Sequence, residues 1–175
     1  GGISLYQERT RGILRRLAST PMSRGTVVLG KLLARFFVGL IQIGISMLAG
    51  AILFKIDWGP HVVMVVAILC AYAILAALAG MILGNFGKSE GQLVAVGVIL
   101  TNILAAIGGC MWPIEITPEW AQKAGLVLPT GWVMDAMHKL VSFGDSPLSV
   151  LPHLLLLAGV AVCAAYVISR SFRFQ

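Results

Sequence analysis

Charged residues are scarce in this chain: Asp, Glu, Lys and Arg make up only 11% of its 175 residues. In soluble domains about a quarter of the residues are charged, so this chain lacks the surface that it would need in water. Hydrophobic residues reach 58%, and the mean hydropathy is +0.92. The composition therefore excludes an ordinary soluble domain and predicts an integral membrane protein.

The few charges leave four long charge-free stretches, at residues 36–54, 58–87, 91–114 and 146–169. Each is long enough to cross a hydrocarbon core of about 30 Å as a helix, which takes roughly 18–20 residues. Backbone groups in lipid need internal partners, which favours helices, and the alternating segments of a membrane β-barrel do not occur here. We therefore expect an all-α integral membrane protein with four transmembrane helices, at about 26–54, 61–86, 92–112 and 148–168.

Groups that carry enzyme chemistry are also scarce. The three cysteines, Cys70, Cys110 and Cys163, form no CxxC pair, and the three histidines lack metal-ligand spacing. Residues 87–89 resemble the end of a phosphate-binding loop, but Ile82 stands where that loop needs its first glycine. No acidic residue lies inside the charge-free stretches, so we expect neither an enzyme nor a cofactor bound by this chain.

Basic residues accumulate near the two ends of the sequence. Residues 1–35 hold seven Lys and Arg against the single acid Glu8, and Arg170 and Arg173 lie near the end. Lys and Arg favour the cytoplasmic side, and four crossings return the chain to its starting side. Both termini of this chain are therefore expected in the cytoplasm. Because topology accounts for the positive charge, it does not indicate nucleic-acid binding.

The first 25 residues form a basic, partly amphipathic segment that precedes the membrane domain of residues 26–175. A helix over about 4–19 would place Ile13, Leu14 and Leu17 on one face, and Pro21 would end it. Such a helix either lies on anionic lipid headgroups or docks onto a cytoplasmic partner. Composition alone leaves both interpretations open.

Polar residues inside the spans are few. Gln42, Thr101 and Asn102 lie near the middle of the first and third predicted spans. Polar side chains at that depth face protein or a water-filled path, and hydrogen bonding between helices is their commonest role. They are therefore candidates both for packing and for lining a transport path.

Prolines interrupt the region from about 113 to 147, at Pro113, Pro118, Pro129 and Pro147. Between them lie two amphipathic pieces, about 119–128 and 131–143, and neither is long enough to span a bilayer. Irregular backbone at membrane depth requires cover by protein or water. We expect a pair of short re-entrant helices on the outer side, with tryptophans at the interface.

The order of these features resembles the permease subunits of type-two ABC exporters. Residues 8–17 read Glu-Arg-Thr-Arg-Gly-Ile-Leu-Arg-Arg-Leu, residues 20–24 read Thr-Pro-Met-Ser-Arg, and residues 29–31 read Leu-Gly-Lys. That family has a similar run after its second membrane helix. Residues 111–115, 118–120 and 128–129 resemble its outer re-entrant region, and Leu151-Pro152 resembles the start of its last helix.

The resemblance implies that this chain holds the last four of six spans of a permease in a bacterial or archaeal inner membrane. A separate P-loop ATPase subunit would bind ATP and Mg²⁺, and a second permease chain would complete the path. A hydrophobic or lipid-like substrate or drug would leave the cell by alternating access. The residues expected to couple to the ATPase are Glu8, Arg9, Gly12, Ile13, Leu14, Arg15, Arg16, Leu17, Pro21, Gly30 and Lys31. The expected pathway residues are Thr101, Asn102 and Gln42, and the expected outer gate is Pro113, Ile114, Glu115 and Pro118.

Two alternatives remain at the level of sequence. A stand-alone four-helix membrane scaffold, binding a partner without ATP-driven transport, explains the spans and the charge bias equally well. It does not explain the order of motifs in the basic segment or the two short outer helices. A membrane-embedded enzyme would need acids, bases or metal ligands inside the spans.

Overall fold

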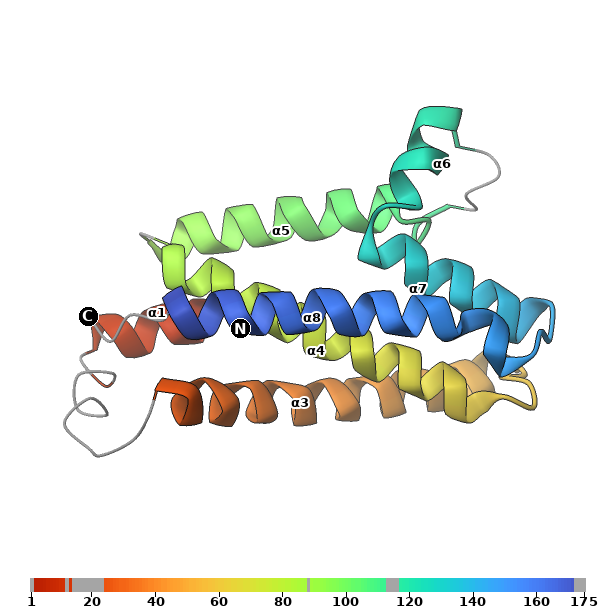
Figure 1. Cartoon of the computed structure of the whole chain (residues 1–175), viewed down its shortest axis with the longest axis horizontal. Helices are drawn as coiled ribbons and strands as arrows, with labels where there is room; N and C mark the ends of the chain where they lie inside the picture. The colour runs from red at the N-terminus through yellow and green to blue at the C-terminus, as the bar shows by residue number, and fades with distance from the viewer. Residues whose placement is uncertain (1, 12, 14–23, 88, 113–116, 172–175) are drawn as a thin grey trace.

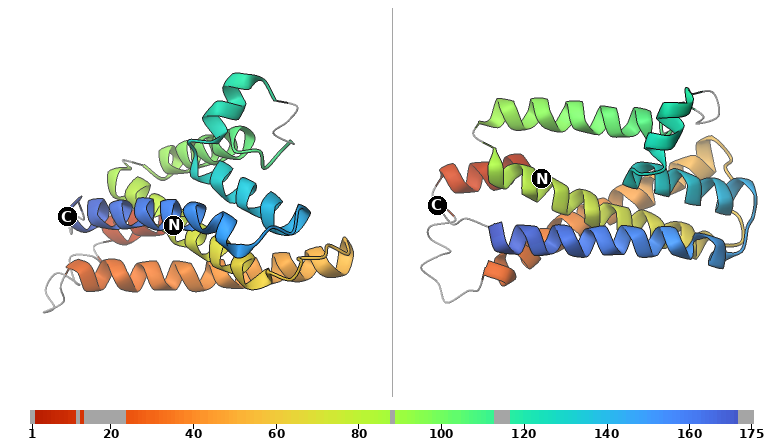
Figure 2. Two further views of the ribbon diagram at one scale, coloured as in Figure 1. Left: turned by 45° about the vertical axis from the view of Figure 1, so that its right-hand side comes forward. Right: turned by 45° about the horizontal axis from the view of Figure 1, so that its top comes forward.

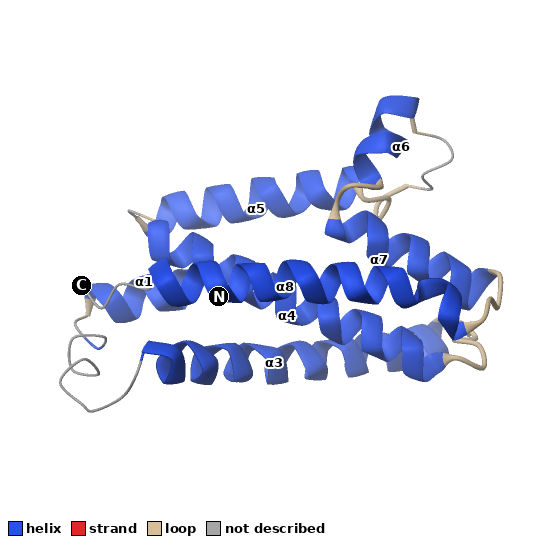
Figure 3. Ribbon diagram, in the orientation of Figure 1, coloured by secondary structure: helices blue, strands red, loops and turns tan. Residues whose placement is uncertain are grey.

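The computed structural model describes residues 2–11, 13, 24–87, 89–112 and 117–171, and every regular element in these ranges is helical (Figures 1 and 3). Four helices are long and apolar enough to cross a membrane. They are α3 (Arg24–Leu53), α4 (Val62–Phe86), α5 (Glu90–Ile107) and α8 (Leu151–Ser171). The prediction of an all-helical protein with four long apolar helices is confirmed.

The remaining elements are short. Helix α1 (Gly2–Thr10) precedes α3, and α6 (Glu119–Gly125) and α7 (Pro129–Met137) lie between α5 and α8. Helix α7 continues as the π-helix η2 (His138–Ser142), and the 3₁₀ turn η3 (Pro147–Val150) leads into α8. The two short pieces predicted between 113 and 147 are therefore helices, as expected, although α6 ends before the predicted boundary at 128.

Helix α4 is the centre of the bundle. It contacts α1, α3, α5, α7 and α8, and Val65, Ile68 and Leu78 on it are buried. Small residues let its neighbours approach closely. A Cβ on Gly84 would lie 2.6 Å from the Cα of Gly2, so α1 packs directly against the α4 backbone. The second long helix is therefore closely packed at this end.

Helix α5 lies apart from the other long helices along most of its length (Figure 2). Leu93 is its one buried residue, and its contacts are with α1, α4, α6 and α7. Its exposed faces are apolar, with Val98, Ile99 and Ile103 at least half exposed. Apolar side chains lose nothing in contact with lipid tails, so such a helix suits a bilayer.

Several helix boundaries differ from the predictions. Helix α5 ends at Ile107 rather than at 112, because Gly108 and Gly109 follow and Gly109 has φ +80°. A positive φ favours glycine and breaks the helical path. Helix α8 begins at Leu151 rather than at 148, after the 3₁₀ turn that starts at Pro147. Helix α1 stands in the place of the helix predicted over 4–19. It ends at Thr10, and residues 14–19 lie outside the described part of the chain.

The bundle has two chemically different ends (Figure 1). One end, which we call the basic end, holds α1, the start of α3, the end of α4 and the end of α8, with Arg11, Lys31, Arg35 and Arg170. The other end, which we call the hairpin end, holds α6, α7, η2 and the loop between α3 and α4. The side of the membrane that each end faces remains a prediction from the charge distribution.

Candidate functional site

An ion pair joins α1 to α3 at the basic end. Lys31 Nζ donates to Glu8 Oε2, and Ser4 Oγ donates to Glu8 Oε1 at 3.2 Å. The two charged side chains are largely buried, at 27% exposed for Glu8 and 20% for Lys31. The structure thus brings together two residues that were predicted to couple to an ATPase, one within the basic segment and one after it.

Three further predicted coupling residues lie in the described part of the chain. Arg9 lies in α1, and Ile13 is 42% exposed. Gly30 lies on an exposed face of α3, where an added Cβ would meet nothing within 4 Å. The remainder lie outside the described residues: Gly12, Leu14, Arg15, Arg16, Leu17 and Pro21. Their coupling role stays a prediction.

A buried amide ties α4 to α8 at the same end. Asn85 is 5% exposed, and its Nδ2 donates to the carbonyl oxygen of Ser171 at 2.7 Å. This carbonyl lies in the last turn of α8, where no backbone N–H of the same helix reaches it. The ends of α4 and α8 are therefore fixed to each other at the same end of the bundle as the Glu8–Lys31 pair.

We expect Asn85→Ala to lower stability by about 1–2 kcal/mol, because it takes this donor away from the Ser171 carbonyl. Thermal unfolding in detergent measures the effect. Asn102→Ala is the matched control, since the Asn102 amide donates to the Val98 carbonyl of its own helix at an exposed position. Equal melting temperatures for the two variants would contradict a stabilising role for the Asn85 contact.

An apolar groove of about 490 Å³ lies between α4 and α5 and is named here the α4–α5 groove. Its walls include Leu75, Ala79 and Leu83 of α4 and Val94, Gly97 and Thr101 of α5. Gly2 and Ile3 line it towards the basic end, and Pro129 and Thr130 line it towards the hairpin end. Of the predicted pathway residues, Thr101 lies in this groove, with its hydroxyl donating to the Gly97 carbonyl at 2.7 Å.

The other two pathway candidates lie elsewhere. Asn102 is on the exposed surface of α5 and does not line the groove, and its amide bonds to the Val98 carbonyl at 2.8 Å. Gln42 lines a second cavity of about 690 Å³ between α3 and α4, named here the α3–α4 groove. Tyr72, Ala76 and Gly80 of α4 border both grooves, so this row of residues separates the groove on the α5 side from the groove on the α3 side.

The corner between α5, α6 and α7 is closely packed. Thr130 is 5% exposed, and its hydroxyl donates to the Leu104 carbonyl at 2.9 Å. A Cβ on Gly108 would overlap the Thr130 side chain, and one on Gly131 would lie 2.6 Å from the carbonyl carbon of Gly125. Three glycines therefore allow the chain to turn back on itself at this corner. Pro118 of the predicted outer gate is exposed at the start of α6, and Pro113, Ile114 and Glu115 lie outside the described residues.

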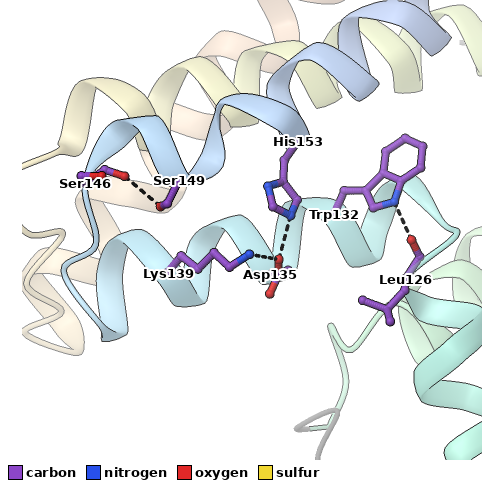
Figure 4. A network of polar contacts seen from close by, with 7 residues as sticks. All are labelled: Leu126, Trp132, Asp135, Lys139, Ser146, Ser149 and His153. Carbon is purple, nitrogen blue, oxygen red and sulfur yellow. Dashed lines mark hydrogen bonds and ion pairs between the residues drawn. The ribbon is translucent and has the colours of Figure 1, made fainter.

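A charged cluster, named here the Asp135 cluster, joins α7 to α8 at the hairpin end (Figure 4). Asp135 Oδ2 accepts from Lys139 Nζ at 2.7 Å and contacts His153 Nε2 at 2.7 Å. Burial alone would raise the pKa of Asp135, but the hydrogen bonds and charges of Lys139 and His153 outweigh it and hold that pKa below its usual value. His153 is 15% exposed, and its Nδ1 is buried without a hydrogen-bond partner.

Sequence reasoning missed this cluster because its two helices lie apart in the chain. Asp135 and Lys139 are four positions apart, which is the spacing of a helical ion pair. His153 gave the one usable signal, since a titratable side chain in an apolar stretch needs a polar partner. The described residues contain no group of three His, Cys, Asp or Glu side chains that could hold a metal ion.

These features define a multi-pass helical membrane protein with a basic end and a short helical hairpin at the other end. Residues 1–169 match the family described as ABC-2 family transporter protein. The chain belongs to this family of ABC transporter permeases.

Three curated relatives are similar to the chain. It is 29% identical to the linearmycin resistance permease protein LnrN of Bacillus subtilis, over 85% of this chain and 38% of LnrN. It is also 29% identical to the putative transport permease YvfS of the same organism, over 83% of this chain and 59% of YvfS. Identity to ABC transporter G family member 20 of Dictyostelium discoideum is 22%, over 81% of this chain and 20% of that protein.

The chain therefore spans about two fifths of LnrN and three fifths of YvfS. No solved structure matches the chain.

Proposed function

We propose that this chain supplies four membrane helices of an exporter permease that is driven by a separate P-loop ATPase subunit. The observation that carries the proposal is the match of residues 1–169 to the ABC-2 family. A permease of this family implies a partner ATPase, and the chain itself has no complete phosphate-binding loop. The similarity to LnrN, a resistance permease by name, favours export of a hydrophobic or lipid-like compound.

We propose the basic segment as the contact with that ATPase. A helix at the membrane surface transmits a push only when both of its ends are held. The Glu8–Lys31 pair supports this role because it fixes α1 to α3 on either side of residues 11–23. Apolar anchors at Ile13, Leu14 and Leu17 and the charges of Arg9, Arg15 and Arg16 would then dock into a groove of the partner.

We place the proposed substrate path beside α5, between this chain and a second permease chain. Helix α5 supports this placement because it exposes most of its apolar surface and carries Thr101 and Asn102 near mid-length. ATP-driven closure of the ATPase subunits would switch the pair of permeases between inward-facing and outward-facing states. The region 113–118 at the hairpin end would form the outer gate. Gln42 is set apart from this path by its place in the α3–α4 groove.

The test is co-purification of the ATPase with the full-length parent protein from detergent-solubilised membranes. We expect Arg15→Glu/Arg16→Glu to reduce the recovered ATPase at least tenfold, because the reversed charges would repel the docking groove. Arg170→Glu is the matched control: it reverses a charge at the same end of the bundle, at a residue whose guanidinium lies 5.4 Å from the Tyr166 ring centre. If no ATPase is recovered with the wild type, or if the double variant retains it, the coupling proposal fails.

A further inference from the structure

The α3–α4 groove has one charged residue in its wall, Arg35. Its neighbour Lys31 is paired with Glu8, whereas Arg35 takes part in none of the ion pairs among the described residues. The other walls are apolar or uncharged, with Val38, Leu69 and Ala73 among them. The nearby acid Glu8, which lines a small cavity with Arg35, is the partner of Lys31, so the groove combines a largely apolar wall with one positive charge that forms no ion pair of its own.

Arg35 lies at the depth where lipid headgroups are found. The charge-free stretch that follows it, 36–54, is about 28 Å long as a helix, which matches a hydrocarbon core of about 30 Å. Along α3 the groove extends from Arg35 to Met47, a distance of about 18 Å. One leaflet of the core is about 15 Å deep. The groove thus begins at the interface and continues for the depth of one leaflet.

We propose that the α3–α4 groove binds one anionic phospholipid from the leaflet at the basic end, with its phosphate on Arg35 and one acyl chain along the groove. A guanidinium binds phosphate oxygens through two parallel N–H donors, which suits this headgroup. Basic pockets between membrane helices are a known way to hold anionic lipids. The cavity of about 690 Å³ is in the range of pockets that enclose small ligands.

The space for the acyl chain comes from small residues on α4. Ala73, Ala76, Ala77 and Gly80 face the groove, and their side chains leave room that large residues would fill. Trp58 and Met137 line it towards the hairpin end. Because the groove has no acidic residue, a zwitterionic lipid would bring its own cation close to Arg35. The net negative headgroup is therefore preferred.

The experiment uses the full-length parent protein with every tryptophan except Trp58 changed to phenylalanine. Lipids brominated near the acyl end quench a tryptophan that they contact. We expect brominated phosphatidylglycerol to quench Trp58 about fivefold more effectively than brominated phosphatidylcholine, the preference that one interfacial arginine confers. Arg35→Gln should reduce this ratio to about one, and Arg35→Lys should keep most of it.

Two controls separate the groove from general surface charge. Arg170→Gln removes a positive charge at the same end but outside the groove, and Gln42→Leu changes the groove wall but not its charge. Both should keep the wild-type ratio. Native mass spectrometry of the protein with all its tryptophans, in mixed phosphatidylglycerol and phosphatidylcholine, gives an independent count of retained anionic lipid.

Three results would overturn the proposal. One is equal quenching by both lipids in the wild type, and another is an Arg170→Gln effect as large as that of Arg35→Gln. The third is a Trp58 that neither lipid quenches, which would mean that protein fills the groove. The proposal requires only that the chain lies in a membrane, so it stands or fails separately from ATPase coupling.

Discussion

Gly131→Ala should lower the melting temperature of the protein by about 10 °C, equivalent to about 3 kcal/mol of overpacking. The new methyl group would overlap the Gly125 carbonyl, with the carbonyl carbon only 2.6 Å from the Cβ position. The Gly125 atoms are backbone atoms and the alanine methyl group is fixed to its Cα, so no side-chain rotation relieves the overlap. The corner where α6 turns into α7 would have to open, and the Thr130 bond to Leu104 would be lost with it.

The matched control is Gly159→Ala in α8, where a Cβ meets nothing within 4 Å. It should leave the melting temperature unchanged or raise it slightly, because alanine favours a helix over glycine by about 1 kcal/mol. Thermal unfolding of the two variants in the same detergent measures the difference. A melting temperature for Gly131→Ala within about 2 °C of that of Gly159→Ala would show that the corner is not tightly packed.

The four spans could be predicted because membrane insertion is decided locally. A stretch without charges and long enough for the hydrocarbon core becomes a helix whatever surrounds it. The ends of the spans are less local. Helix α5 ends at Ile107, before Gly109 with φ +80°, and Gly108 lies there against Thr130, a contact between residues 22 positions apart that no window of sequence reveals.

The short helices show the same limit. Proline spacing predicted two helical pieces in the region 113–147, and α6 and α7 occupy those places. The sequence did not predict that α7 and η2 belong to the core, where Ala136 and Leu140 are fully buried. That burial depends on the fold bringing α7 against α4 and α8, which is a long-range property.

For the candidate sites, the sequence supplied residues but not partners. Glu8 and Lys31 were both expected to take part in coupling, and their pairing across 23 positions required the structure. Thr101, Asn102 and Gln42 were grouped because they are polar residues within spans. The structure separates Gln42 from Thr101 by α4, since helix rotation decides which groove a residue faces.

The second large effect is expected at the Asp135 cluster. Asp135→Asn removes the negative charge that both Lys139 and His153 contact, and leaves these two side chains facing a neutral amide. Charge-assisted hydrogen bonds of this kind contribute about 1.5–3 kcal/mol when buried. The Asp135 side chain is 39% exposed, so solvent screening reduces the expected loss to about 1–2 kcal/mol, or a melting temperature lower by about 3–6 °C at pH 7.

The pH dependence of this difference follows from the direction of the pKa shift. The pKa of Asp135 is lowered in the folded protein, so its stabilising effect is complete above the ordinary carboxyl pKa of about 4. It is lost as the pH falls through the folded-state pKa. The difference in melting temperature between wild type and Asp135→Asn should therefore be present at about pH 5 and above and shrink below about pH 4.

Asp145→Asn is the control for removing a negative charge, because Asp145 is exposed and forms none of the ion pairs among the described residues. It should leave the melting temperature unchanged at every pH. Two results would rule out a stabilising role for the charges of the Asp135 cluster. One is a wild-type melting temperature for Asp135→Asn at pH 7, and the other is a difference that persists undiminished at pH 3. If the expected difference is found, the charge of Asp135 stabilises the hairpin end of the bundle in addition to the packing of α7 against α4 and α8.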